Sequence, residues 1–475
     1  MPHKISVIWP SQDERIETQS KIAHALASAI EDIARGPAAP IYSSAQIRRA
    51  LAKFDFHTPM PVDDAATEVI ELLKRGTVHM MHPGYFGLFN PSVTFPGMVA
   101  DQITAAINPQ LAVWSHAAVA VEIERHTIDA VAGLLGWTAD QAAGHFTTGG
   151  AEANYTAVLI ALTRQFPEFG STGARALSAQ PRLYVSAESH LAWLKIAHQA
   201  GIGRESVCLV GTDGMGRMSA ASLRASISAD RQNGRLPFFV GATAGTTNAG
   251  MIDPLEDCNH IAHREGLWLH VDAAWGGAGL MSPRVKDRLA GIQAADSVTI
   301  DAHKWFAVPM GAGMFLCREN ALLGDTFRVS TGYMPTTEAA VDPYTHSVQW
   351  SRRFIGLKLF LSLACLGWEG YRAHIEHALD MSNELRTLLA GNGWRVVNDS
   401  PLAVICFTDE QHDADPIAIT EHVVASGNAW ISTAQFEGTR VLRACITSHL
   451  TRREHLAALM TALTNARDDV LVHRM

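Results

Sequence analysis

The sequence predicts an α/β protein of more than one unit, with a mainly parallel sheet in its central part. Its 475 residues exceed the usual length of one domain, about 100–200 residues. Apolar residues at 47%, charged residues at 18% and 37 glycines are typical of a globular chain with many strand–loop–helix connections. From about residue 145 to 320, short apolar runs alternate with helical patterns, as expected for parallel strands joined by helices.

The N-terminal part of the chain is expected to be helical. Ile22, Leu26, Ile30 and Ile33 recur at spacings of three and four and predict an amphipathic helix that ends near Gly36. In an isolated arm its apolar stripe would face water, so packing against a second subunit is one use for it. More helices are expected between 67 and 136, one of them with an apolar side formed by Val121, Ile128, Val131 and Leu135.

The central strands are expected to be buried on both faces, because several are apolar almost throughout. We expect them at 182–185, 207–210, 238–242, 267–271, 298–300 and 313–317. After about residue 375 a smaller α/β unit is expected, with strands near 394–397, 402–407, 429–432 and 441–447 and helices through Leu385, at 417–425 and from 452. The expected division is a helical segment at 1–80, a large domain at 81–375 and a small C-terminal domain at 376–475.

Charge and cysteine usage disfavour several classes of protein. The net charge is −9 at pH 7, and no basic stripe interleaved with aromatic residues occurs, so we expect no nucleic acid partner. The six cysteines are far apart without a CxxC pair, as in reduced thiols of a cytosolic protein. The start resembles no signal peptide, and no apolar span reaches 18 residues, so we expect a cytoplasmic protein that does not enter the membrane.

One of the apolar strands, 267–271, is followed by a carboxylate. Asp272 stands where open α/β sheets place their ligands, although an Asp at this point often only caps the next helix. The next predicted strand leads to His303, Lys304 and Trp305, and Lys304 comes 32 residues after Asp272, about one strand–helix–strand step. A lysine between His and Trp after a buried strand is not typical of a surface.

This pair suits a pyridoxal 5′-phosphate (PLP) cofactor. A lysine amine condenses with the aldehyde of PLP to a Schiff base, and a carboxylate against the pyridine nitrogen keeps it protonated, so that the ring can accept an electron pair. Gly149 and Gly150, before a helix from Ala151, let backbone N–H groups approach a phosphate at the helix N-terminus. His190 also follows a strand and could stack on the ring, although a His there often only begins a helix.

Five motifs in order make the pattern specific. They are TTGGAEAN (147–154), SAESHLAW (186–193), GATAGTT (241–247), HVDAAWGG (270–277) and DAHKWF (301–306). From about His82 to Arg440 the chain resembles the group II PLP-dependent decarboxylases, which include aromatic-amino-acid, glutamate, cysteine-sulfinate and diaminobutyrate decarboxylases. The resemblance implies a type I aminotransferase-like fold with a seven-stranded sheet and a small C-terminal domain. It also implies an obligate homodimer with exchanged N-terminal helices and active sites at the interface.

The resemblance assigns a role to each motif residue. Lys304 would carry the Schiff base, Asp272 would bind the pyridine nitrogen, and His190 would stack on one face of the ring. The other cofactor contacts would come from Ala274 on the opposite face, Thr247 at the ring edge, and Thr148, Gly149, Gly150 and His303 around the phosphate. Asp301 stands where the aromatic-amino-acid branch carries Asn. Because an acid would repel the phosphate, we leave Asp301 out of the predicted site.

The reaction depends on which bond of the substrate is held perpendicular to the cofactor ring. In the family a tyrosine on a mobile loop, roughly thirty residues after the lysine, returns a proton to the α-carbon. Tyr333 follows Lys304 by 29 residues and is the candidate acid, although a half-buried loop tyrosine fits the spacing equally well. Relatives that form aldehydes typically replace this tyrosine or the stacking histidine, and the presence of both here favours simple decarboxylation to an amine.

The substrate is less clearly indicated. The family's side-chain pocket draws on segments that correspond to 88–91 and 110–114, and these look smaller and more polar than in the aromatic branch, with Gln110 and Ala112. Neither segment contains an Arg or Lys to bind a side-chain carboxylate, although Arg352 and Arg353 could reach in. An aromatic or heteroaromatic L-amino acid is favoured over an acidic or diamino one.

Other functions stay open at this point. The same scaffold could form an aldehyde by decarboxylation or transfer an amino group, and a PLP-binding homologue without turnover would belong to a different class. His260 and His263 share a helical face, but no third ligand has zinc-site spacing, so we expect no metal.

Overall fold

The computed structural model describes residues 8–40, 42–329 and 341–472. The chain divides into two compact units. One comprises the described residues up to Gly87 together with His412–Ser432 and the C-terminal stretch from Ser448, and the other comprises Leu88–Gln411 and Thr433–Thr447. The division into three domains expected from the sequence stays a prediction.

The first unit is helical. It contains α1 (Gln12–Arg35), α2 (Ser44–Leu51), α3 (Val62–Gly76), α14 (Pro416–Ala425) and α15 (Arg453–Val472). Ser11 begins α1 with a capping box in which its side chain accepts from the backbone of Glu14 while the Glu14 carboxylate accepts from the backbone N–H of Ser11. The helix ends at Arg35 before Gly36, as predicted. It packs against α3, and α14 packs against α15.

The second unit contains both sheets. Its helices are α4 (Phe95–Ile107), α5 (Ala118–Leu134), α6 (Gly150–Gln165), α7 (Phe169–Thr172), α8 (Ala192–Gln199), α9 (Ala220–Gln232), α10 (Leu255–Arg264), α11 (Pro283–Lys286), α12 (Ala321–Phe327) and α13 (Leu357–Gly391). The strands of its large sheet are β1 (Ala143–Thr147), β2 (Pro181–Ser186), β3 (Val207–Val210), β4 (Leu236–Thr243), β5 (Trp268–Asp272), β6 (Ser297–Asp301) and β7 (Gly313–Cys317). The smaller sheet consists of β8 (Trp394–Val396), β9 (Val404–Asp409), β10 (Ser432–Phe436) and β11 (Thr439–Cys445).

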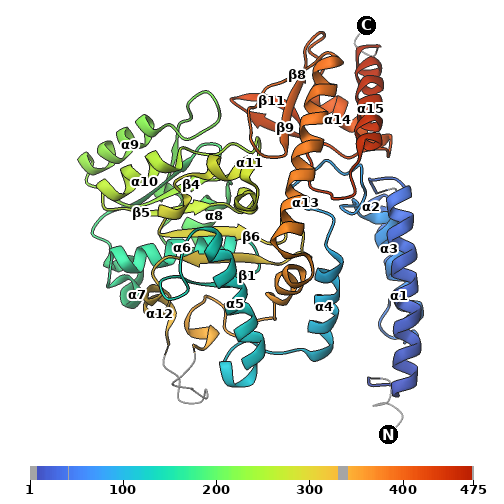
Figure 1. Cartoon of the computed structure of the whole chain (residues 1–475), viewed down its shortest axis with the longest axis horizontal. Coiled ribbons are helices and arrows are strands. Elements are labelled where there is room, and N and C mark those ends of the chain that lie inside the picture. The colour runs from blue at the N-terminus through green and yellow to red at the C-terminus, as the bar shows by residue number, and fades with distance from the viewer. Residues whose placement is uncertain (1–7, 41, 330–340, 473–475) are drawn as a thin grey trace. The chain divides into compact units, whose positions relative to one another are not determined.

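Within the described residues the large sheet has seven strands in the order β1-β7-β6-β5-β4-β2-β3. Strand β7 runs antiparallel to both of its neighbours, and the other pairings are parallel. Helices α6 and α8 pack together on one face of the sheet, and α9 and α10 pack together on the other (Figure 1). The mainly parallel sheet and the smaller C-terminal sheet confirm the α/β fold predicted from the sequence.

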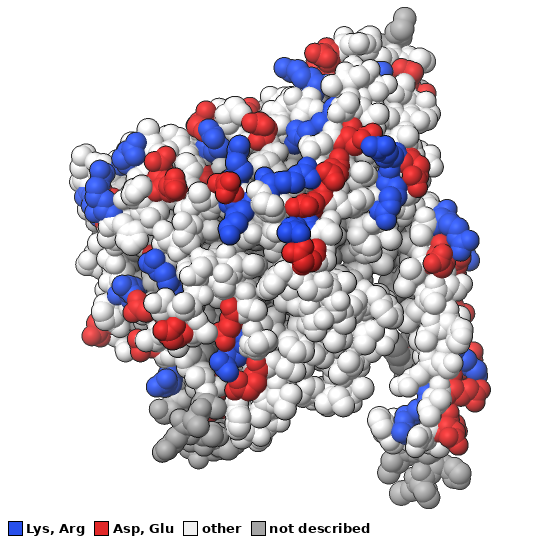
Figure 2. Space-filling model, in the orientation of Figure 1, with Lys and Arg blue, Asp and Glu red and all other residues white. Residues whose placement is uncertain are grey.

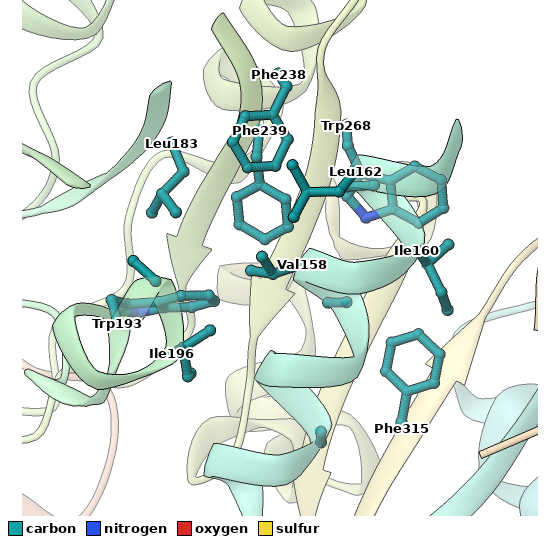
Figure 3. Close-up of a cluster of buried hydrophobic side chains, with 14 of the residues drawn as sticks. Val158, Ile160, Leu162, Leu183, Trp193, Ile196, Phe238, Phe239, Trp268 and Phe315 are labelled. Carbon is teal, nitrogen blue, oxygen red and sulfur yellow. The ribbon is translucent and has the colours of Figure 1, made fainter. Parts of the chain in front are cut away.

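The core of the large sheet lies between α6, α8 and the strands beneath them. Val158 and Leu162 of α6 lie beside Phe239 of β4, and Ile160 lies on the side of Trp268 and Phe315 (Figure 3). Trp193 of α8 packs against Phe239 with ring centroids 5.6 Å apart. Because these side chains are almost fully buried, α6 is held rigidly with its N-terminus at one edge of the sheet.

Two strands differ from the expected positions. Strand β1 was not among the predicted strands, because it contains Gly144 and only its second half is buried. Residues 429–432 were expected as a strand, but Trp430 forms an isolated bridge with Tyr85 instead. The observed β10 begins at Ser432 and joins β11 through the two-residue turn Glu437-Gly438, in which both residues have positive φ.

Lys and Arg side chains are mixed with Asp and Glu on the face drawn in Figure 2, which shows no extended region of one sign. Among the described residues, none of the helices combines the length and the hydropathy that a membrane crossing requires. All six cysteines are described and none is in a disulfide. Cys365 is exposed, whereas four of the others are buried.

Candidate active site

Two neighbouring strands of the large sheet end in charged side chains. β5 and β6 pair in parallel with Asp272 opposite Thr299, so their C-terminal ends lie at the same edge of the sheet. Asp301 ends β6, and in the turn that follows, the backbone N–H of Lys304 donates to the Asp301 carbonyl at 3.1 Å. This edge opens into a cavity of about 270 Å³, where ligands of α/β proteins commonly bind.

All nine residues predicted around the cofactor line this cavity. They are Thr148, Gly149, Gly150, His190, Thr247, Asp272, Ala274, His303 and Lys304. The cavity also contains Phe89, which belongs to a segment expected to form the side-chain pocket, and Asp301, which was left out of the predicted site. The lining residues that were not predicted at all are Ala151, Asn154, Ala192, Thr243, Gly245 and Trp275. Tyr333, the predicted acid, lies outside the described residues.

Asp272 is held by two hydrogen-bond donors. Its Oδ1 accepts the backbone N–H of Ala274 at 3.1 Å, and its Oδ2 accepts from Nδ2 of Asn154 at 2.8 Å. Only 7% of Asp272 is exposed. Because an ionised carboxylate can only accept, this arrangement orients an acceptor toward the cavity.

A row of buried side chains stands behind Asn154. His270 Nε2 lies 2.9 Å from Asn154 Oδ1, and His270 Nδ1 lies 2.8 Å from Ser297 Oγ. Burial lowers the pKa of His270 to about 4, so the ring is neutral and has one N–H. Asn154 donates to Asp272 through its nitrogen and therefore offers its oxygen to Nε2, which must carry the proton. The row fixes the orientation of Asn154 and, through it, of Asp272.

Lys304 is paired with the carboxylate that the sequence prediction left out. Its Nζ lies 3.1 Å from Asp301 Oδ2, and it lies 5.7 Å from the centroid of the Phe89 ring. The side chain of Asp301 is only 2% exposed. Charge repulsion with a phosphate therefore does not keep Asp301 out of the cavity, because the lysine compensates its charge.

His303 presents a donor to the same space. Its Nδ1 accepts the backbone N–H of Ala312 at 3.1 Å, so the proton of the neutral ring is on Nε2. Burial lowers the pKa of His303, which favours that neutral form. Nε2 lies 3.7 Å from Asp301 Oδ2, beyond hydrogen-bond distance, and is thus available to a ligand.

The turn between β1 and α6 lacks side chains where an anion would bind. Gly149 and Gly150 lie at the N-terminus of α6, a helix of 16 residues. A Cβ atom at Gly149 would lie 3.3 Å from His303 Cε1, and one at Gly150 would lie 2.9 Å from Asp301 Oδ2. Backbone N–H groups at a helix N-terminus attract anions, so this turn suits a phosphate group.

Two of the other predicted residues, Thr148 and His190, are held by local bonds. The hydroxyl of Thr148 donates to Glu152 Oε2 at 2.7 Å. His190 Nδ1 accepts the backbone N–H of Ala192 at 3.0 Å, which leaves the proton of the neutral ring on Nε2. Both bonds set the direction of a side chain at the cavity wall.

A stack of aromatic rings forms another wall. Phe89 stacks on Trp275 and Trp275 on Trp305, each pair with ring centroids 4.5 Å apart. The guanidinium carbon of Arg443, a residue only 2% exposed, lies 4.8 Å from the centroid of Phe89. The motifs that contain Trp275 and Trp305 were visible in the sequence, but their stacking with Phe89 was not.

The arginines that could have reached the cavity do not line it. Arg352 Nη1 lies 2.5 Å from Glu124 Oε2, and Arg353 Nη2 lies 3.0 Å from Asp101 Oδ1. Of the two segments expected to form the side-chain pocket, 88–91 and 110–114, only Phe89 contributes to the described lining. The expectation that Arg352 or Arg353 could bind a substrate is therefore wrong for the described cavity.

These residues fit a pyridoxal phosphate. Lys304 offers an amine to the aldehyde, Asp272 a carboxylate to the ring nitrogen, and the Gly149-Gly150 turn with His303 offers N–H donors to the phosphate. The two glycines carry no Cβ atoms, which would otherwise crowd His303 and Asp301 at the cavity wall.

Comparison with known proteins agrees with this chemistry. The family model described as the pyridoxal-dependent decarboxylase conserved domain matches residues 48–409. An aromatic-L-amino-acid decarboxylase of Bacillus atrophaeus is 29% identical over 422 residues, covering 85% of this chain and 86% of that protein. The acidic amino acid decarboxylase GADL1 of Bos taurus is 33% identical over 341 residues, covering 70% of this chain and 64% of that protein.

The crystal structure of mouse CSAD superposes with a TM-score of 0.90 at 25% identity, covering 96% of this chain and 99% of that one. This structural likeness extends over both units of the chain. The family model matches about three quarters of the chain's 475 residues. With a cavity that suits PLP and a family match over most of its length, the chain belongs to the pyridoxal-dependent decarboxylases, enzymes that use PLP to remove CO₂ from an amino acid.

Proposed function

We propose that this decarboxylase attaches PLP to Lys304 and binds the pyridine nitrogen with Asp272. The observation that carries the proposal is the single cavity in which an amine and an oriented carboxylate come from the ends of adjacent strands. When bound, PLP supplies an electron sink for the electron pair that the departing carboxylate leaves behind. The chain's own residues then have to bind, orient and move protons.

Five of the other predicted residues have a proposed task. His303 Nε2–H and the N–H groups of Gly149 and Gly150 would hold the phosphate. His190 would stack on one face of the ring. Tyr333, outside the described residues, is the proposed acid that returns a proton to the substrate's α-carbon.

The proposed substrate is an aromatic or heteroaromatic L-amino acid. Phe89, backed by Trp275, offers a flat apolar wall against which a planar side chain can pack. The test is a panel of the twenty common and selected non-protein L-amino acids, with released CO₂ and amine measured separately. Highest kcat/KM for an aromatic substrate is expected, and preference for an acidic or diamino substrate contradicts the proposal.

An acidic amino acid is the second candidate, favoured by Arg443. Arg443 does not itself line the described cavity, but its buried guanidinium lies against Phe89, which does, and arginine binds a side-chain carboxylate strongly. One relative is named for acidic substrates. In the same panel, turnover of aspartate or cysteine sulfinate that is lost in Arg443→Gln would support this candidate.

The panel also decides between the remaining alternatives. Aldehyde and ammonia in place of amine would indicate an aldehyde synthase. Bound PLP without turnover of any substrate would indicate a non-catalytic homologue. The panel includes diamino substrates such as 2,4-diaminobutyrate because a diamino acid is one of the alternative substrates.

We further propose that the enzyme works as a homodimer. Large apolar side chains are exposed on α1 and α3, where Ile16 is 57% and Leu73 57% exposed, and on α4, where Phe95 and Ile107 are each 73% exposed. Exposed apolar surface of this kind commonly marks an interface. Sedimentation velocity is expected to give a dimer, and a monomer at micromolar concentration contradicts the proposal. The cytoplasmic location stays a prediction.

A further inference from the structure

A buried lysine on α13 has no task in the proposed site. Lys358 lies in the first turn of α13 and is only 4% exposed. Its Nζ donates to the carbonyl of Met310 at 2.8 Å and to the carbonyl of Pro309 at 3.4 Å. Burying an ammonium is costly unless hydrogen bonds and charges compensate it. Two carbonyls of one turn provide part of that compensation, so the lysine and the turn stabilise each other.

Asp101 of α4 is the acid beside Lys358. Its Oδ2 lies 3.5 Å from Lys358 Nζ, and its Oδ1 accepts from Arg353 Nη2 at 3.0 Å. One carboxylate is thus shared by two cations. Because the Met310 carbonyl lies closer to Nζ than the acid does, the shortest bond of the ammonium is to the turn.

This turn is the one that carries His303 and Lys304. It joins β6 to the antiparallel β7. Ala307 in the turn has a φ of 54°, a left-handed conformation that residues other than glycine rarely adopt. Such a backbone persists only where neighbouring groups hold it. The N–H of Thr94 donates to the Ala307 carbonyl at 2.7 Å, and Lys358 holds the tip of the turn a few residues further on.

The tip of the turn is linked to the ring of His303 through Ala312. Ala312 comes two residues after Met310, and its N–H donates to His303 Nδ1 at 3.1 Å. The N–H of His303 donates back to the Ala312 carbonyl at 3.1 Å. The bond to Nδ1 keeps the proton of the neutral ring on Nε2, which is the proposed phosphate donor. A shift of the tip would therefore move Ala312 and release the ring.

The charge of Lys358 also acts on His303. Burial is the largest cause of the lowered pKa of His303, and the positive charges of Lys304 and Lys358 lower that pKa further, whereas Asp301 raises it. The two lysines thus favour the neutral ring, in which Nδ1 can accept the N–H of Ala312.

We propose that Lys358 is a positioning residue of the phosphate site and acts through His303. By holding the carbonyls at the tip of the turn, it keeps the Ala312 N–H on His303 Nδ1, so that Nε2–H stays available to the phosphate. Lys358 itself does not line the described cavity. The inference rests on the proposed function, in which His303 binds the phosphate of PLP.

The test is a double-mutant cycle on the PLP affinity of the full-length chain, measured by equilibrium dialysis. His303→Leu removes the proposed donor and is expected to raise the dissociation constant of PLP at least about tenfold, because a hydrogen bond to a charged group is lost. Lys358→Met has a similar size but no donor, and it is expected to raise the constant about tenfold in the otherwise wild-type chain. In the His303→Leu chain the same change is expected to alter the constant less than about twofold, since residues that act through one group are not additive. A further loss of about tenfold in the double variant overturns the proposal, because independent effects multiply.

Pyridoxal, which lacks the phosphate, distinguishes positioning of His303 from a general loosening of the turn. The affinity of Lys358→Met for pyridoxal, measured by absorption titration, is expected to stay within about twofold of the wild type. A loss as large as the loss for PLP would mean that Lys358 supports the whole turn, Lys304 included, and it overturns the proposal.

Arg386→Met is the matched control on the same helix. Arg386 also donates to carbonyls of a connection between strands, those of Asn398, Ser400 and Val404, and none of these residues lines the cavity. Its loss is expected to leave the PLP affinity within about twofold of the wild type. Should Lys358→Met not fold, Lys358→Gln replaces it in the same cycle, with the same expected results.

The cycle also separates the two possible failures. If His303→Leu binds PLP as tightly as the wild type, the proposed phosphate site is wrong and the role of Lys358 fails with it. If His303→Leu weakens PLP binding but Lys358→Met does not, only the role of Lys358 fails.

Discussion

Asn154→Leu tests the row of side chains that orients Asp272. The change removes the bond from Nδ2 to Asp272 at 2.8 Å and the bond from His270 to Oδ1 at 2.9 Å. A hydrogen bond to a charged group contributes about 1.5–3 kcal/mol and a neutral one about 0.5–1.5 kcal/mol, and leucine has a similar volume. The free energy of unfolding is therefore expected to fall by about 2–4 kcal/mol. Urea unfolding of the cofactor-free chain, followed by tryptophan fluorescence, measures it.

Thr163→Ala is the matched control on the same helix. Among the residues that the structure describes, the hydroxyl of Thr163 bonds to the carbonyl of Leu159 within α6, at 2.9 Å, and to no other group, so its loss is expected to cost less than about 1 kcal/mol. Asn154→Leu is also expected to bind PLP more weakly, because Asp272 loses one of its two orienting donors. An Asn154→Leu chain within about 0.5 kcal/mol of the wild type and with unchanged PLP affinity would refute the reasoning.

Three further changes have clear expected outcomes. Tyr333→Phe is expected to keep the visible absorption of bound PLP but to lose amine production, and an unchanged amine yield removes Tyr333 from its role. Gly150→Ala is expected to weaken PLP binding, measured by equilibrium dialysis, because its Cβ would lie 2.9 Å from Asp301 Oδ2. His145→Phe is expected to reduce acid sensitivity. Burial lowers the pKa of His145 to about 3, so between about pH 6.5 and pH 4 the unfolded chain takes up a proton at this histidine but the folded chain does not. The free energy of unfolding of the wild type therefore falls by about 3 kcal/mol by about pH 4. Equal urea midpoints of both chains at that pH contradict this account.

The fold and the family were predictable because the informative residues lie in short contiguous motifs. Asp272 and Lys304 each follow a buried apolar strand, and one strand–helix–strand step separates them, so their meeting at one edge of the sheet follows from chain geometry. Six of the seven strands of the large sheet were predicted for the same reason, since runs that are apolar throughout indicate burial on both faces.

Contacts between distant segments could not be predicted in this way. The bond from Asn154 to Asp272 joins residues 118 positions apart, and no local pattern indicates it. Arg352 and Arg353 looked able to reach the substrate, but Arg352 is paired with Glu124 of α5 and Arg353 with Asp101 of α4. Asp301 was left out of the predicted site because only its repulsion of the cofactor's phosphate was considered. In the structure the adjacent amine of Lys304 compensates the charge of Asp301.

The attachment of PLP to Lys304 is the claim on which the proposed mechanism depends most. Borohydride reduction of the PLP-loaded full-length chain, followed by peptide mapping, locates the attached group directly. We expect the pyridoxyl group on Lys304 in the peptide that contains Asp301 and Trp305. A group on any other lysine, or none at all, would contradict the proposed site.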